Sequence, residues 1–159
     1  MSGIDRRGFF GALGAKAANR EIIVRPPYAK ESTLFGTECP QCDGMCATLC
    51  EEEIIKIGED KLPYLNFTHS GCTYCEECLK ACEPGVLSDV EVQIQASIRI
   101  NEAKCVAWHD VMCFACKEPC LDDAIIFSGL FRPEIHSDKC TACGFCIERC
   151  PSAAIEIVA

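Results

Sequence analysis

The chain is poor in aromatic residues and contains no long apolar run. Aromatic residues make up 8% of its 159 residues, and eight Phe supply most of that share. So few large apolar side chains would struggle to form a core of ordinary size, and we therefore expect covalent or coordinate bonds to help stabilise the fold. No apolar stretch approaches the ~18 residues of a membrane-spanning helix, so none is predicted.

Signals of substrate chemistry are also missing. The stretch GALGAK (residues 11–16) fits neither the dinucleotide-binding pattern nor the phosphate-binding loop pattern. The three His residues, His69, His109 and His136, are scattered, and no nucleophile–base pair can be identified. We therefore predict a protein that is not an enzyme and has no catalytic residues.

Charge is distributed unevenly along the chain. The net charge is −9, but residues 1–30 carry six basic and two acidic side chains, a balance of +4. The remainder carries nine basic and 22 acidic side chains, a balance of −13. An acidic body argues against a nucleic-acid partner. The basic N-terminal segment is either a frayed solubilising end or an arm that contacts a partner.

Cysteine is the most informative residue of this chain. There are 16 Cys, about one residue in ten, a level that in a short chain indicates disulfides or metal. They fall into four quartets with none left over: Cys39, Cys42, Cys46 and Cys50; Cys72, Cys75, Cys78 and Cys82; Cys105, Cys113, Cys116 and Cys120; Cys140, Cys143, Cys146 and Cys150.

Quartets two and four have the spacing of iron–sulfur ligands. Both match C-x2-C-x2-C-x3-C, the bacterial ferredoxin run, in which three thiolates on a tight loop converge on one cubane and the fourth ligates the partner cluster. Disulfides require an oxidising compartment and rarely take this spacing. Structural zinc prefers paired C-x2-C knuckles with a longer spacer. We therefore predict four [4Fe–4S] clusters, with all sixteen Cys as metal ligands.

Quartets one and three depart from this spacing. Quartet one has one extra residue between Cys42 and Cys46, and Gly44 can adopt the backbone angles that let this residue bulge outward. Quartet three has five extra residues after Cys105. Without Cys105 one cluster would have only three Cys, so Cys105 is predicted to be a ligand. The alternative is that His109 or Asp110, in the intervening loop, replaces its thiolate.

The pairing of the quartets has two possible forms. In sequential pairing, quartet one shares its clusters with quartet two, and quartet three with quartet four. In nested pairing, quartet one goes with four and two with three. The similar gaps between quartets favour sequential pairing, which with exchange of the fourth Cys predicts four ligand sets: Cys39, Cys42, Cys46 and Cys82; Cys72, Cys75, Cys78 and Cys50; Cys105, Cys113, Cys116 and Cys150; Cys140, Cys143, Cys146 and Cys120.

Short strands are predicted between and after the quartets. Residues 53–67 and 124–135 read as hairpins, with turns at Glu59-Asp60 and Ser128-Gly129, and residues 154–159 read as a closing strand. Residues 90–100 alternate apolar and polar side chains with a period of two, which predicts strand, with a break near residues 95–97. Each quartet with the strand that follows it makes a repeat of about 30 residues.

These patterns predict an α+β fold made of two tandem bacterial two-[4Fe–4S] ferredoxin-like modules, with small hairpins and short helices around the clusters. The predicted boundaries are a basic N-terminal arm over residues 1–31, a first module over residues 32–95 and a second over residues 96–159.

The sequence resembles the NapF family, the ferredoxin-type iron–sulfur proteins of the periplasmic nitrate reductase system. The resemblance rests on DRRGFFG (5–11), RPPY (25–28), the four quartets and the displaced first Cys of CVAWHDVMC (105–113). It implies a cytoplasmic protein that contacts the precursor of the nitrate reductase catalytic subunit before export and assists its iron–sulfur maturation. The chain departs from the family in CDGMC (42–46), which leaves open whether the first cluster is [4Fe–4S] or [3Fe–4S].

The N-terminal residues have features of an export signal. Arg6-Arg7 and Phe9-Phe10 fit a twin-arginine signal, but the apolar region from Gly8 to Ala15 is short, contains three Gly and is followed by Lys16. We therefore expect a retained arm in a cytoplasmic protein, which docks a partner or touches an anionic membrane surface.

Three functions fit these observations. The first is an accessory ferredoxin that assists maturation of a molybdoenzyme. The second is an electron-transfer subunit that passes electrons along a chain of clusters to an oxidoreductase. In the third, the clusters are structural or sensory. Spacing alone does not separate the first two.

Overall fold

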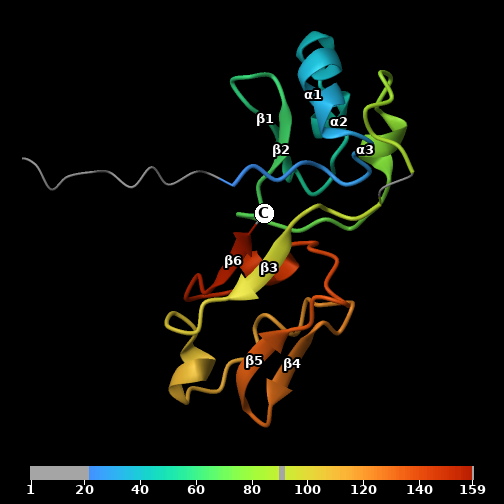
Figure 1. Cartoon of the computed structure of the whole chain (residues 1–159). Coiled ribbons are helices and arrows are strands. Elements are labelled where there is room, and N and C mark those ends of the chain that lie inside the picture. The colour runs from blue at the N-terminus through green and yellow to red at the C-terminus, as the bar shows by residue number, and fades with distance from the viewer. Residues whose placement is uncertain (1–21, 90–91, 159) are drawn as a thin grey trace, which may run out of the picture.

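The computed structural model describes residues 22–89 and 92–158, which form a small α+β fold with two halves, one above the other in Figure 1. The upper half contains the α-helices α1 (Ser32–Glu38), α2 (Met45–Thr48) and α3 (Glu77–Lys80), a 3-10 turn (Cys39–Gln41), and the strands β1 (Ile55–Ile57) and β2 (Pro63–Leu65). The lower half contains β3 (Ser97–Ile100), a 3-10 turn (Val106–His109), β4 (Ile125–Ser128), β5 (Phe131–Ile135), α4 (Phe145–Glu148) and β6 (Ile155–Val158).

The two predicted hairpins are confirmed. Strands β1 and β2 pair antiparallel, and Asp60 in their turn accepts a hydrogen bond from the Leu62 N–H at 3.0 Å. Strands β4 and β5 also pair antiparallel, and Gly129 in their turn has φ +67°, a backbone angle that glycine adopts without strain. In each hairpin one buried Ile, Ile55 or Ile125, faces inward beside the Cys loops.

The predicted strand over residues 90–100 is only partly correct. Residues 90–91 lie outside the described residues, residues 92–96 form no strand, and β3 begins at Ser97, where we expected a break. β3 pairs antiparallel with the closing strand β6. Ile94 is buried, and its N–H donates to the Tyr74 hydroxyl oxygen at 3.4 Å instead of to a strand ladder. The alternation of apolar and polar residues therefore correctly indicated a buried side chain here, but it did not indicate a paired strand.

The fourfold repeat is visible in the backbone. Three residues after the last Cys of each quartet, the chain adopts a positive φ, and the N–H of that residue bonds back to the carbonyl of the Cys. The residues at this position are Glu53, Gly85, Asp123 and Ala153. The same turn thus ends all four quartets and directs the chain away from the thiols, although only one of the four residues is glycine.

The last residues of the predicted N-terminal arm pack against the body. Residues 1–21 lie outside the described residues, but Val24, Pro26, Pro27 and Tyr28 are buried in the body. The Val24 carbonyl accepts the Leu65 N–H at 2.8 Å, and an isolated antiparallel bridge joins residues 29 and 87. The two prolines favour an extended backbone. The segment therefore packs along the upper half in an extended form, beside β2.

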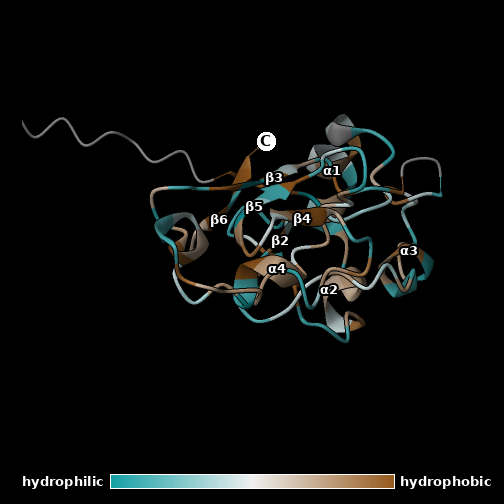
Figure 2. Ribbon diagram, turned by 90° about the horizontal axis from the view of Figure 1, so that it is seen from below, coloured by the Kyte–Doolittle hydropathy of each residue, from teal (hydrophilic) through white to brown (hydrophobic). Residues whose placement is uncertain are grey.

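One apolar core runs through both halves and includes thiols. Phe35, Val86 and Ile125 are almost completely buried, and no polar or charged residue among the described ones is buried. Cys78, Cys116 and Cys146 belong to the same core cluster. In Figure 2 apolar colours lie on elements such as β4 and α4, while the loops around them carry a mixture of apolar and hydrophilic colours. The core is therefore organised around the cysteine loops.

Candidate metal centres

The tight loops of quartets two and four owe their shape to pairs of residues with positive φ. In quartet two these residues are Tyr74 (φ +55°) and Glu76 (φ +67°), on either side of Cys75. In quartet four they are Ala142 (φ +56°) and Gly144 (φ +88°), on either side of Cys143. Alternating handedness coils the backbone around its own thiols, and the third Cys of each loop then lies in the short helix α3 or α4.

Quartet one reaches a similar shape by another route. Its first residues form the 3-10 turn Cys39–Gln41, and Gly44 has φ +69° immediately before α2, as the sequence predicted for the extra residue. A Cβ at Gly44 would come within 3.4 Å of the Ile57 side chain. The inserted residue is therefore absorbed before Cys46, which lies in a short helix like the third Cys of quartets two and four.

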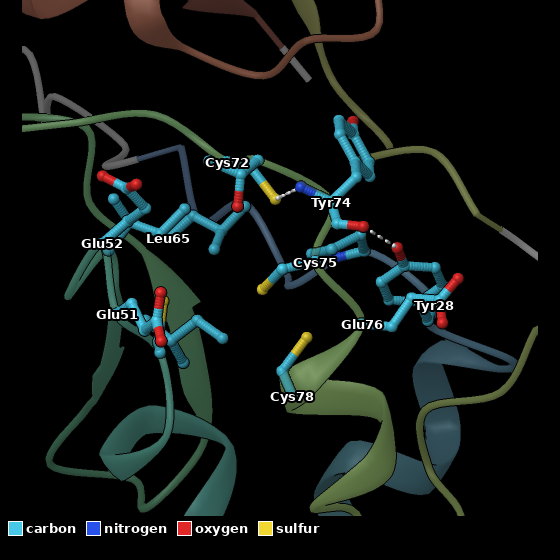
Figure 3. Close-up of a pocket in the computed structure, with 14 residues that line it drawn as sticks. Tyr28, Glu51, Glu52, Leu65, Cys72, Tyr74, Cys75, Glu76 and Cys78 are labelled. Atoms are coloured by element: carbon cyan, nitrogen blue, oxygen red, sulfur yellow. Dashed lines mark hydrogen bonds between the residues drawn. The ribbon is translucent and has the colours of Figure 1, made fainter.

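In the upper half the thiols gather in two sites. Site I joins quartet one to the last Cys of quartet two around a small, partly open cavity. Site II joins quartet two to the last Cys of quartet one around a similar cavity. Figure 3 shows the sulfur atoms of Cys72, Cys75 and Cys78 pointing toward one another in site II. The members are Cys39, Cys42, Cys46 and Cys82 in site I, and Cys50, Cys72, Cys75 and Cys78 in site II.

The lower half repeats this arrangement. Site III surrounds a small, partly open cavity. In site IV, Cys105 is buried in a small cluster against which Cys113 and Cys150 pack, and these three thiols lie close enough to Cys116 to add to the effect of burial in raising its pKa. The members are Cys120, Cys140, Cys143 and Cys146 in site III, and Cys105, Cys113, Cys116 and Cys150 in site IV. The structure therefore groups the sixteen thiols as sequential pairing predicts and not as nested pairing would.

Cys105 and the loop that follows it take clear positions in the structure. His109 is exposed, and its Nε2 lies 3.2 Å from the Ala103 carbonyl oxygen, whereas Cys105 is buried beside Ala107 and Ala154. The loop is held to the second hairpin by Trp108, whose indole N–H donates to the Pro133 carbonyl at 3.2 Å. The extra residues of quartet three thus form an anchored turn outside site IV, while Cys105 itself reaches the other thiols.

Backbone N–H groups point at the sulfur atoms. The N–H of Tyr74 lies 3.4 Å from Sγ of Cys72, and the N–H of Leu87 lies 3.4 Å from Sγ of Cys82. The Ala154 N–H lies 3.3 Å from Sγ of Cys150. Such donors stabilise a negatively charged sulfur, which is the form that binds iron.

Burial opposes ionisation of most of these thiols while they are free. Burial, followed by the charges of neighbouring thiols, raises the pKa of Cys46 to about 11 and that of Cys78 to about 12. Burial also raises the pKa of Cys116 to about 11. Burial acts in the same direction on Cys150, but hydrogen bonds from Ser152 and Ala154 outweigh it and lower the pKa of this thiol. Metal loading must therefore displace protons from the sites.

The arrangement suits a cluster of several metal atoms. All sixteen thiols are free, so no disulfide competes for them. Within residues 22–89 and 92–158, no group of three or more His, Cys, Asp or Glu side chains has the geometry of a single-ion site. Instead each of sites I to III presents four thiols around a cavity with a largely apolar lining, and iron–sulfur clusters are held by four Cys thiolates. The residues present thus fit the [4Fe–4S] group.

Two Tyr residues beside site II were not identified from sequence. The Tyr28 hydroxyl donates to the Tyr74 carbonyl at 3.1 Å, and the two rings meet edge to face with centroids 6.4 Å apart. Burial, reinforced by neighbouring thiols, raises the pKa of Tyr28 to about 12, so its hydroxyl remains a proton donor. Tyr28 belongs to the RPPY stretch, which indicated only the resemblance to the NapF family. Nothing in the local sequence indicated that Tyr28 contacts Tyr74.

A family model and several curated relatives match this chain. Residues 133–156 match the 4Fe-4S binding domain. The chain is 34% identical over 156 residues to the ferredoxin-type protein NapF of Escherichia coli K12, which covers 95% of this chain and 92% of the relative. It is 31% identical to the ferredoxin-type protein NapF of Haemophilus influenzae, with 94% and 88% covered. The methylamine utilization ferredoxin-type protein MauM of Methylorubrum extorquens is 27% identical, with 85% and 72% covered.

In the described residues, no helix has the length and apolar character needed to cross a membrane. The similarity to NapF extends over nearly the full length of both proteins and includes all four Cys quartets of this chain. This chain is therefore a member of the NapF family of ferredoxin-type iron–sulfur proteins.

Proposed function

We propose that this chain is a four-cluster accessory protein that works in the cytoplasm on the catalytic subunit of a periplasmic nitrate reductase, assisting its iron–sulfur loading or reduction. The observation that carries the proposal is the gathering of all sixteen thiols into four all-Cys sites in a chain that, among its described residues, shows no other cluster of side chains suited to chemistry. The nitrate reductase partner rests on membership of the NapF family.

The proposed metal ligands are the thiols of sites I to IV, one [4Fe–4S] cluster in each. When bound, the clusters supply one-electron redox chemistry. The chain's own contribution is to hold four thiols around each cavity, to exclude water with apolar walls, and to donate N–H groups to sulfur. In site I these walls include Phe35, Ile57 and Val86, and in site II they include Ile54, Ile55 and Leu65.

The proposal requires two tandem ferredoxin-like modules, one over about residues 32–95 and the other over about residues 96–159. Support comes from the exchange of the last Cys, which occurs only between quartets of the same half. Further support comes from the pairing of β3 with β6, which closes the second half from both of its ends. The segment 24–30 packs against the first module and extends it toward the N-terminus.

The proposed contact with the reductase involves the basic residues that precede the body. The −13 balance of the chain after residue 30 becomes more negative with clusters, because an oxidised [4Fe–4S] centre with four thiolates carries a formal charge of about −2. The basic side chains Arg6, Arg7, Lys16 and Arg20 therefore offer the kind of long-range attraction that steers association and weakens with salt.

A pull-down tests the partner. Under anaerobic conditions, we expect this chain to capture the precursor of the catalytic subunit more strongly than the mature enzyme, and less of it at high salt. Removing residues 1–21 should leave the iron content unchanged, because the buried segment begins at Val24, while weakening precursor binding. The variant with Arg6→Ala and Arg7→Ala should show part of this loss.

The alternative function is an electron-transfer subunit of an oxidoreductase, which the close approach of the two halves also permits. A stable one-to-one complex with the mature enzyme, insensitive to the precursor, would favour this alternative. Binding to neither form would contradict the proposed partner altogether. Cell fractionation tests the location: a shortened periplasmic product would show that the N-terminal residues are an export signal.

A further inference from the structure

Within each half, the two thiol sites are connected by pairs of Cys that are four residues apart. In the upper half, α2 carries Cys46 of site I just before Cys50 of site II, and α3 carries Cys78 of site II just before Cys82 of site I. In each pair the two Cys are four residues apart, so one helical turn connects the sites. In the lower half the same spacing connects sites III and IV through these pairs: Cys116 and Cys120; Cys146 and Cys150.

The two halves meet where site II faces site III. The N–H of Cys72, in site II, donates to the carbonyl oxygen of Cys143, in site III, at 2.6 Å. The approach is so close that glycine is required on both sides. A Cβ on Gly71 would lie 2.6 Å from the Phe145 backbone nitrogen, and a Cβ on Gly144 would lie 2.2 Å from the Phe67 ring. The loops of the two regular quartets therefore pack directly against each other.

Hydrogen bonds of Tyr74 stabilise this contact between the two loops. Its hydroxyl donates to the carbonyl of Thr141 and accepts the Ile94 N–H, and its own N–H points at Sγ of Cys72. Thr141 lies in the site III loop, where its hydroxyl donates to the Asp122 carboxylate at 2.7 Å. One side chain thus connects a site II loop, a site III loop and the segment that joins the halves. Figure 3 shows Tyr74 beside Cys72 at the edge of site II, with Tyr28 against it.

We propose that the four sites form one unbranched row in the order I, II, III, IV, and that the Cys72–Cys143 contact, held in place by Tyr74, is the bridge by which electrons pass between the two halves. This inference rests on the proposed occupation of the sites by clusters and adds the route between them. The bridge consists of two predicted ligand residues and a single hydrogen bond. Tyr74 is a positioning residue, because it holds the two loops and does not itself carry charge.

The step at the bridge is a transfer of one electron. With clusters bound in sites II and III, one would lose the electron that the other gains, with no bond formed or broken and no proton moved. The role of Tyr74 is therefore to fix the approach of sites II and III, and its loss should be visible as a weaker interaction between them.

The test compares Tyr74→Phe with Tyr64→Phe in the full-length, cluster-loaded protein. Both variants lose one hydroxyl, but Tyr64 lies in β2 and is not one of the residues whose hydrogen bonds join the two loops. Each protein is reduced anaerobically with dithionite and examined by pulsed EPR for spin–spin interaction between clusters, with iron and sulfide measured on the same samples. We expect Tyr74→Phe to keep its iron and sulfide but to lose the interaction between the halves, and Tyr64→Phe to match the unmodified protein.

Each other outcome is decisive. Unchanged iron with an unchanged interaction in Tyr74→Phe would overturn the bridge. Loss of a cluster in Tyr74→Phe would overturn its positioning role, since Tyr74 would then retain metal. An unmodified protein without iron would instead refute the proposed function, and one with four clusters but no interaction between the halves would refute the row alone. As a second variant, Gly144→Ala should separate the loops and also abolish the interaction.

Discussion

The inner sites II and III and the outer sites I and IV are built by different kinds of loop. The two quartets with regular spacing supply three thiols each to the inner sites, while the two quartets with inserted residues supply three thiols each to the outer sites. The inner loops contact each other through their backbones, from Cys72 to Cys143. Spacing is therefore strict where a loop is part of the junction and relaxed where it is not.

The outer loops show how insertions are accommodated. In quartet one, Gly44 turns the chain at a positive φ so that the added residue precedes α2. In quartet three the added residues form a 3-10 turn anchored by Trp108, and Cys105 stays buried among its partner thiols. Gly44 lies against Ile57 and Trp108 bonds to Pro133, so these contacts of the two insertions lie within their own halves.

Removing the metal should affect inner and outer sites together. The thiols lie within the core, and few large side chains are available to replace their contribution, so iron removal with a chelator should abolish cooperative unfolding. Circular dichroism and calorimetry on loaded and stripped protein measure this. A stripped protein that still melts as a compact domain would show that the fold does not depend on its clusters.

Replacing an outer thiol should affect one site. Cys105→Ser is expected to convert or lose the cluster of site IV and to spare the other three, a loss of about a quarter of the iron. His109→Ala is the matched control in the same loop and should leave all iron in place, because His109 is exposed. Iron analysis and EPR decide. Full iron in Cys105→Ser, with loss in His109→Ala, would mean that the loop His and not Cys105 is the ligand.

Placing a methyl group at the junction should destabilise the contact between the inner loops. Gly144→Ala adds a Cβ against Phe67 and strains a positive φ, which should cost about 1–3 kcal/mol. Gly36→Ala is the control in α1, where a Cβ meets nothing within 4 Å and should stabilise the helix by about 0.5–1 kcal/mol. Thermal midpoints of the loaded proteins should therefore move in opposite directions. A neutral Gly144→Ala would contradict the tight packing of the halves.

The smallest effect is expected from the surface of the β3–β6 pair. Glu156 accepts hydrogen bonds from Lys104, Asn101 and Arg99, in that order of effect, and these lower its pKa to about 2. Because the folded-state pKa is depressed, the stabilisation is fully present at neutral pH and is lost as the pH falls through about 2. Glu156→Gln should lower the thermal midpoint slightly at low salt and less at high salt. A large drop in the thermal midpoint would show that these surface contacts of Glu156 contribute much of the stability of the fold.

Much of this architecture could be predicted from the sequence because thiol spacing fixes local geometry. The crossing of the fourth Cys follows from its place one helical turn beyond the third, and the two hairpins follow from their turn residues. The backbone shape of the loops of quartets two and four was harder to predict from the sequence, because Tyr74 and Ala142 adopt a positive φ that their residue types disfavour. Only the tertiary contacts of these loops explain those angles.

Contacts between the halves could not be predicted. Nothing in the local sequence indicates that Gly71 and Gly144 are required by close approach, or that Tyr74 reaches Thr141, because these residues are about 70 positions apart and a side-chain pattern reports only local structure. For the same reason the burial of Pro26 and Pro27 was missed. Periodicity over residues 92–96 likewise reflected the burial of Ile94 and not a strand.

The most direct test of the central claim is the metal content of the protein purified without oxygen. Four all-Cys sites predict about sixteen iron and sixteen inorganic sulfide per chain, in a brown protein whose reduced form gives EPR signals of interacting [4Fe–4S] clusters. About fifteen iron would instead point to a three-iron cluster in site I. A colourless protein that carries zinc and no sulfide would contradict the assignment of the four sites to iron–sulfur clusters.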